Sequence, residues 1–253
     1  MNAATAATAT VPASPVARDG EPRLDLYAPI HKAWRSFMMD TLHRIGRMDV
    51  FDAADTACQL DQLESLLQQC EQHIEHENAH VHSAIERRQP DAGLTTPADH
   101  AEHHQSIAAL RFEMAVLRGA GAGASVDVDA QSLIGLAHRL YRHLALFVAE
   151  NFQHMHHEET VNNALLWAHY SDAELMQLHA QILATVSPQE HLLTARWMVP
   201  ALNPAERAAI VGGMQPQMPP EAFLGVMSVL RPHLDGGGWD KLARAVGLPV
   251  DLR

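Results

Sequence analysis

The sequence predicts an all-α fold, an up-down-up-down four-helix bundle followed by a C-terminal helical extension. Hydrophobic residues make up 47% of the chain and aromatic residues only 5%, and the abundant Ala and Leu favour helices. Apolar residues recur at alternating spacings of three and four in long segments, which is the period of a helix with one buried face. Stretches rich in proline and glycine separate these segments.

The bundle is expected to contain four amphipathic helices, over residues 30–48, 53–88, 98–117 and 130–169. The buried face predicted for the first is His31, Trp34, Met38, Thr41, Ile45 and Met48. Pro90, Gly93 and Pro97 break the chain after the second helix, and the glycine-rich residues 119–127 break it after the third. Because these connections are short, neighbouring helices are expected to run antiparallel.

Three parts are expected along the chain: a disordered tail, the bundle and the extension, over residues 1–24, 25–170 and 171–253. The tail is rich in Ala, Thr and Pro and lacks the features of a secretory signal. The extension has readable helix starts, since Ser171 with Glu174 and Ser187 with Glu190 match the capping box. We expect its short helices to pack on the bundle.

The charge of the chain excludes some classes of partner. Its 253 residues contain 18 Lys and Arg against 30 Asp and Glu, a net charge of -12, which argues against nucleic acid and anionic membrane as partners. No apolar run is long enough to span a membrane. Cys58 and Cys70 lie on one predicted helix, roughly 18 Å apart, too far for a disulfide. A cytoplasmic location is therefore expected.

The chemical signal in the sequence is a repeated His-x-x-x-Glu step. His73 precedes Glu77, and His154 precedes Glu158, each by four residues, so each pair shares one helix face. Both pairs lie on the predicted core-facing stripe, where unpaired polar groups cost several kcal/mol each. Imidazole and carboxylate together suit one or two transition-metal ions.

Other histidines are expected at the same pole as these two steps. In an up-down-up-down bundle, the starts of the first and third helices lie beside the ends of the second and fourth. His31 lies near the start of the first helix, and His100 and His104 lie near the start of the third. His80 and His103 are alternatives that could replace a ligand of this set. The predicted metal ligands are His31, His73, Glu77, His100, His104, His154 and Glu158.

On these residues, over positions 29–167, the chain resembles the bacterial hemerythrin-like (HHE cation-binding) proteins. The resemblance implies a four-helix bundle that holds two iron ions, with an open position for O2 or a similar small ligand. It implies that Glu77 and Glu158 bridge the ions and that five histidines complete the coordination. The His154–Glu158 step resembles the wider bacterial group and not the animal oxygen carriers, which puts simple O2 carriage in doubt.

The function expected from this resemblance is the binding of O2, nitric oxide or peroxide for sensing, storage or detoxification. Two alternatives stay open. One is a di-iron oxidoreductase that activates O2 or peroxide against an organic substrate, which would need a substrate pocket. The other is a mononuclear zinc or manganese protein that uses only some of the seven residues.

Overall fold

The computed structural model describes residues 23–90, 96–121 and 129–249. All regular secondary structure within these ranges is helical, as the composition predicts. Residues 1–22 of the predicted tail lie outside the described part of the chain.

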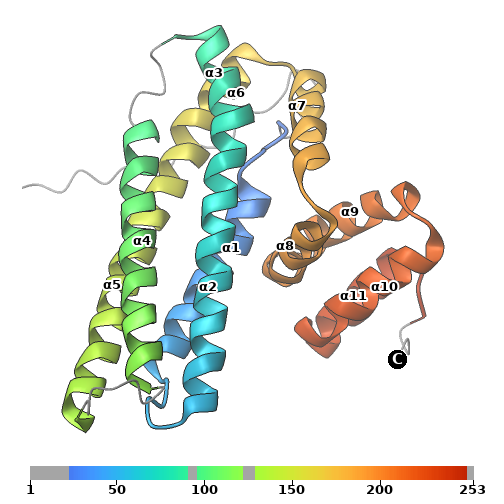
Figure 1. Cartoon of the computed structure of the whole chain (residues 1–253). Coiled ribbons are helices and arrows are strands. Elements are labelled where there is room, and N and C mark those ends of the chain that lie inside the picture. The colour runs from blue at the N-terminus through green and yellow to red at the C-terminus, as the bar shows by residue number, and fades with distance from the viewer. Residues whose placement is uncertain (1–22, 91–95, 122–128, 250–253) are drawn as a thin grey trace, which may run out of the picture.

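The longest helices of the described chain pack against one another (Figure 1). They are α1 (Ala28–Gly46), α2 (Ala53–His76), α4 (Thr96–Gly121) and α5 (Ala130–His157). Helix α1 contacts α2 and α5, and α4 contacts the same two helices from the other side. The four therefore form a closed ring in which every helix has two neighbours.

Two of these helices continue beyond their α-helical part. Helix α2 runs on through a π-helix, η1 (Glu77–His82), into α3 (Ser83–Arg88). Helix α5 runs on through η2 (Glu158–Asn162), also a π-helix, into α6 (Asn163–His169). The predicted helices over residues 53–88 and 130–169 are thus continuous, but each contains one stretch of wider turns.

Side chains fix where two of the helices begin. The Asp52 carboxylate accepts hydrogen bonds from the backbone N–H groups of Ala54 and Asp55 at the start of α2. Asp129 does the same for Ser132 at the start of α5. Such caps satisfy N–H groups that have no partner within the helix, and each stabilises it by about 1 kcal/mol.

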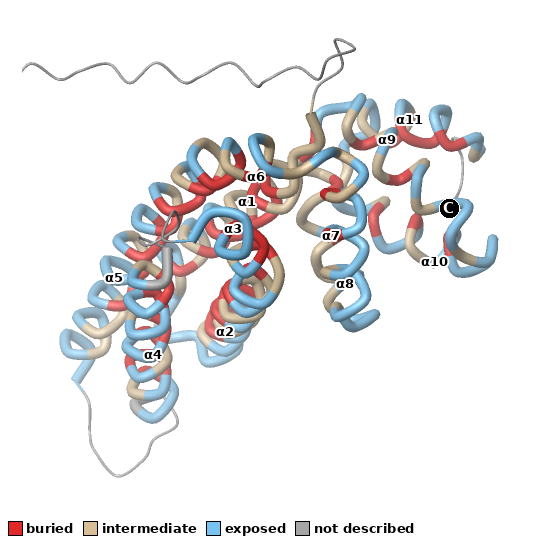
Figure 2. Tube along the Cα trace, turned by 90° about the horizontal axis from the view of Figure 1, so that it is seen from above, coloured by how far each residue is buried: buried red, intermediate tan, exposed pale blue. Residues whose placement is uncertain are grey.

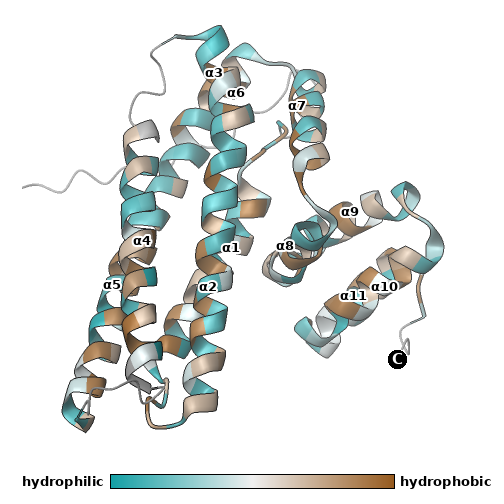
Figure 3. Cartoon of the chain, viewed as in Figure 1, coloured by the Kyte–Doolittle hydropathy of each residue, from teal (hydrophilic) through white to brown (hydrophobic). Residues whose placement is uncertain are grey.

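The core between the four helices is apolar and closely packed. Leu63, Leu110, Leu144 and Phe147 are among its fully buried side chains. The buried faces of the helices point inward (Figure 2). Hydrophilic residues become more frequent towards the upper ends of α2 and α5 (Figure 3). Burial of each large apolar side chain contributes about 1.5 to 3 kcal/mol, so this core can support a polar site at one end.

The extension consists of short helices, some of which form a second apolar core. They are α7 (Asp172–Thr185), α8 (Pro188–Ala201), α9 (Pro204–Met214), α10 (Pro220–Leu230) and α11 (Gly236–Ala245), with short 3₁₀ turns η3 (Gln215–Gln217) and η4 (Arg231–His233). Both predicted capping boxes are present, and Asn203 with Glu206 forms a third. Trp239 of α11 is buried in the second core.

Helix α8 joins the extension to the four packed helices. It lies along α1, where the rings of Phe37 and Trp197 stack with their centroids 4.2 Å apart. An ion pair between Lys32 and Glu206, 2.6 Å long, adds a contact from α9. No helix in the described part of the chain is long and apolar enough to cross a membrane.

We expect Trp197→Ala to lower the free energy of unfolding by about 3 kcal/mol, because it removes the ring that stacks on Phe37. Urea unfolding followed by circular dichroism measures the change. Leu192→Ala, on an exposed position of the same helix, is the control and should cost less than about 0.5 kcal/mol. Equal losses for both variants would contradict a specific role of the stacked pair.

Candidate metal centre

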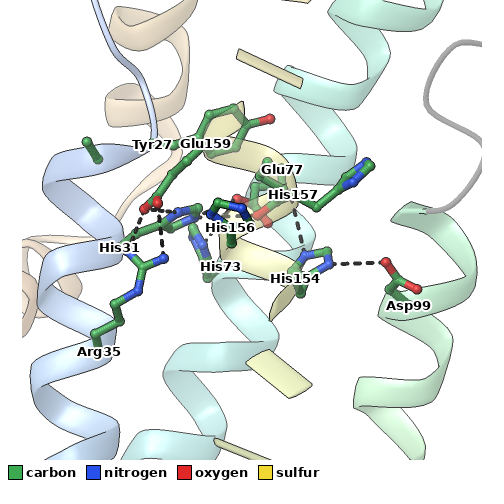
Figure 4. A network of polar contacts seen from close by, with 12 residues as sticks. Tyr27, His31, Arg35, His73, Glu77, Asp99, His154, His156, His157 and Glu159 are labelled. Carbon is green, nitrogen blue, oxygen red and sulfur yellow. Dashed lines mark hydrogen bonds and ion pairs between the residues drawn. The ribbon is translucent and has the colours of Figure 1, made fainter. Parts of the chain in front are cut away.

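Histidine and glutamate side chains from four helices meet at one pole of the molecule. Figure 4 shows part of this cluster, with His31, Glu77 and His154. The starts of α1 and α4 and the ends of α2 and α5 form this pole. Six of the seven predicted ligands lie here, together with one histidine that was not predicted. The seven side chains that meet are His31, His73, Glu77, His82, His100, His154 and Glu158.

One set of donor atoms, termed position one, comes from α1, α2 and α5. The Nε2 atom of His31 lies 3.6 Å from Oε1 of Glu77 and 3.5 Å from Oε2 of Glu158. The Nε2 atom of His73 lies 3.1 Å from the same Oε1 of Glu77. Position one therefore offers two imidazole nitrogens and one oxygen from each glutamate.

A second set, termed position two, uses the other oxygen of each glutamate. Oε1 of Glu158 lies 3.2 Å from Nε2 of His82 and 3.4 Å from Nε2 of His154. Oε2 of Glu77 lies 3.7 Å from Nε2 of His100, which lies 3.0 Å from Nε2 of His154. Position two therefore offers three imidazole nitrogens and two oxygens.

The distances between these atoms fit the edges of a metal coordination shell. Two donors that each lie about 2.1 Å from one ion, at angles of 90° to 109°, are about 3.0 to 3.4 Å apart. The separations described above at both positions run from 3.0 to 3.7 Å.

Several of the donor atoms are also buried without a hydrogen-bond partner in the described part of the chain. They are Nε2 of His31, Nε2 of His73, both carboxylate oxygens of Glu77, and Oε2 of Glu158. Buried polar atoms normally have partners, because an unpaired one costs free energy. A bound ion at each position would satisfy these atoms, so the residues fit a metal centre.

His82 joins the cluster because Glu77 begins a π-helical turn. In η1 the backbone hydrogen bonds join residues five apart, so a residue five positions after Glu77 returns to the same face. A regular helix with 3.6 residues per turn would instead bring His80 to this face, which is why the sequence favours His80 over His82. The five-residue spacing from Glu77 was the available signal, but π-helical turns are too rare to assume.

The structure corrects the prediction for His104. Its side chain is exposed, whereas that of His103 is 4% exposed and faces the core. The buried face of α4 runs through His100, His103 and Ile107, at spacings of three and then four. The predicted face instead stepped from His100 to His104, which is turned away from the core by about 100° relative to His103.

A small cavity adjoins the centre on the side of the apolar core. Its volume is about 10 Å³, which is about the space of one water molecule. Trp34, Cys70, His73, Glu77 and His103 are among the residues that line it. Trp34 thus walls the site, and Nδ1 of His103 is buried here with no hydrogen-bond partner among the described residues.

Other side chains contact Nδ1 of two of the histidines, the ring nitrogen on the side away from the metal positions. Nδ1 of His31 lies 3.1 Å from Oε1 of Glu159, and Arg35 donates hydrogen bonds to both oxygens of that glutamate (Figure 4). Nδ1 of His154 lies 3.5 Å from Oδ2 of Asp99. A proton on Nδ1 leaves Nε2 free to bind an ion, so these contacts select the tautomer that a metal needs.

Burial and charge shift the pKa values of the cluster in opposite directions. Burial alone would lower the pKa of His31, but the carboxylates of Glu159, Glu77 and Glu158 outweigh it and raise that pKa to about 9. Burial lowers the pKa of His100 to about 3, with repulsion from neighbouring histidines adding to the effect.

The pKa values of the two glutamates are also shifted in opposite directions. Burial and the charge of Glu158 raise the pKa of Glu77. Burial would also raise the pKa of Glu158, but hydrogen bonds from His154 and His82 outweigh it and lower that pKa. Without metal, the cluster therefore keeps Glu158 ionised with a protonated His31 beside it.

Comparisons with protein-family models, with curated proteins and with solved structures give no match to this chain. The resemblance to hemerythrin-like proteins therefore stays a prediction that depends on the residues named above.

We expect the metal-free protein to be most stable near pH 6.5, the ordinary pKa of histidine. As the pH falls below this value, the unfolded chain binds protons that buried His73 and His100 do not, so stability falls. As the pH rises, the folded protein retains the proton of His31 up to about pH 9, so stability falls again. Melting temperatures of chelator-treated protein between about pH 5 and pH 10 test this.

Glu159→Gln is the matched variant for this prediction. It removes the charge beside His31, which lowers the pKa of that histidine and should flatten the alkaline side of the profile. A melting temperature that rises steadily from acid to about pH 9 would contradict the assignment.

Proposed function

We propose that the chain is a hemerythrin-like four-helix bundle that holds two iron ions and binds O2 or a related small oxidant such as nitric oxide or peroxide. One observation carries the proposal. Each of two buried glutamates places one oxygen in each of two donor sets, with Glu77 and Glu158 between the two sets. This is the arrangement that two bridging carboxylates require. The role proposed is sensing, storage or detoxification.

The five histidines would be shared between the two ions of such a centre. His31 and His73 would hold one ion, and His82, His100 and His154 the other. Iron supplies the redox-active Lewis acid that takes a small ligand. Position one has fewer protein donors than position two, so we propose that the ligand binds there.

The cavity supports a small ligand over an organic substrate. At about 10 Å³ it has room for no more than about one molecule of the size of water. Pockets for organic ligands are typically larger by an order of magnitude or more. The oxidoreductase alternative is therefore the weaker one.

A single zinc or manganese ion is also less well supported. An ion at position two alone would leave the buried, unpaired atoms of position one without a partner. An ion at position one alone would still leave Oε2 of Glu77 without one. Two ions satisfy both sets. Imidazole and carboxylate donors suit both metals, so iron is favoured over zinc by the resemblance alone. The free thiols of Cys58 and Cys70 support the proposal of a cytoplasmic location.

The test is the iron content of protein loaded with ferrous iron without air and then exposed to air. We expect about two iron ions per chain and new visible absorption bands, because the two donor sets suit two ions. One colourless zinc ion per chain, or no bound iron, would exclude the proposed centre.

The amount of iron that a ligand variant loses should depend on whether the substitution removes a donor from one position or from both. His73→Ala removes a donor of position one only, so about one iron should remain. Glu158→Ala removes an oxygen from both positions, so less than about one should remain. His104→Ala is the control and should keep two, since His104 is exposed.

His82→Ala tests the π-helical turn directly. It should reduce the iron content to about one per chain, because it removes a donor of position two. His80→Ala serves as its control and should leave the content unchanged. The opposite result would mean that the chain binds metal with a regular α-helix after Glu77.

A further inference from the structure

One amide side chain holds two histidines of position two. Oδ1 of Asn78 lies 3.0 Å from Nδ1 of His100 and 3.2 Å from Nδ1 of His82. Asn78 follows Glu77 in η1, whereas His100 belongs to α4. The same oxygen therefore ties the rings of two different helices.

Both contacts have the direction that metal binding needs. A histidine that binds an ion through Nε2 carries its proton on Nδ1 and donates it to an acceptor. A carbonyl oxygen has two lone pairs and can accept from two donors. The ring centroids of His82 and His100 lie 5.1 Å apart, and the angle between the ring planes is 29°. One oxygen can therefore accept hydrogen bonds from both rings.

Position one is supported in another way. There, the outer partner of His31 is the carboxylate of Glu159, which Arg35 fixes in place. Asp99 contacts only the third ring of position two, that of His154, at 3.5 Å, and its side chain is 41% exposed. The outer partners of the two positions thus lie on separate side chains.

We propose that Asn78 is the positioning residue of position two, so that its loss weakens this position alone and leaves position one intact. The inference depends on the proposed two-ion centre. Asn78 is exposed and its described side-chain hydrogen bonds go to the two rings, so removal of the side chain should not disturb the fold.

Titration of the metal-free, full-length protein with Co²⁺ in the absence of air tests the proposal, since bound Co²⁺ absorbs visible light. The unaltered protein should bind two ions. In Asn78→Ala one ion should bind with unchanged affinity and the other about 10- to 100-fold more weakly. Asn78→Asp, which has the same shape and keeps an acceptor oxygen, should restore the affinity of the weakened ion.

Three controls separate positioning from a general loss of structure. Gln68→Ala removes an exposed amide from the same helical segment and should change neither step. Glu159→Gln should weaken the ion at position one and not the ion at position two. The melting temperature of metal-free Asn78→Ala should equal that of the unaltered protein.

The ring N–H protons give a second measurement. In the Co²⁺-loaded protein these protons give shifted NMR signals, and those of His82 and His100 should exchange faster with water in Asn78→Ala, because their acceptor is gone. Asn78→Asp should restore slow exchange.

The possible failures are distinct. If the unaltered protein binds fewer than two ions, the proposed function fails. If it binds two and Asn78→Ala binds both with unchanged affinity, or loses both equally, the two-ion centre stands and the role assigned to Asn78 is wrong.

Discussion

Two carboxylates buried next to each other are the constraint on which the rest of this pole depends. Glu77 is 4% exposed and Glu158 is fully buried, and each raises the cost of charging the other. Buried charges persist only with compensating partners. Five histidines, and Arg35 through Glu159, supply that compensation from four helices. The helices can meet there because a long apolar core below holds them together.

The sequence was sufficient to predict much of this arrangement. The spacing of apolar residues located the long helices, and the two His-x-x-x-Glu steps located the glutamates and two histidines. His31 and His100 followed from the expected direction of the helices. All six of these residues lie together in the structure. The spacing rule works because a regular helix fixes the angle between successive side chains.

The two differences arise where that angle was misjudged. At His82 the helix widens into π-turns, and the spacing of five residues from Glu77 is too weak a signal to predict so rare a turn. On α4, histidines occupy both positions 103 and 104, so the sequence fits two rotations of the helix about its axis almost equally well. In the structure, packing against the neighbouring helices buries His103. Contacts between helices, which a single sequence does not show, decide such cases.

Helix α1 contributes both to the cluster, through His31, and to the contact with the extension, where Phe37 stacks on Trp197. A shift of α1 would therefore affect the cluster and this contact together. If undocking of α8 moves α1, it also moves His31. The affinity of position one for an ion then depends on whether α8 is docked. Linkage is reciprocal, so occupancy of position one would change the docking equilibrium of the extension by the same factor.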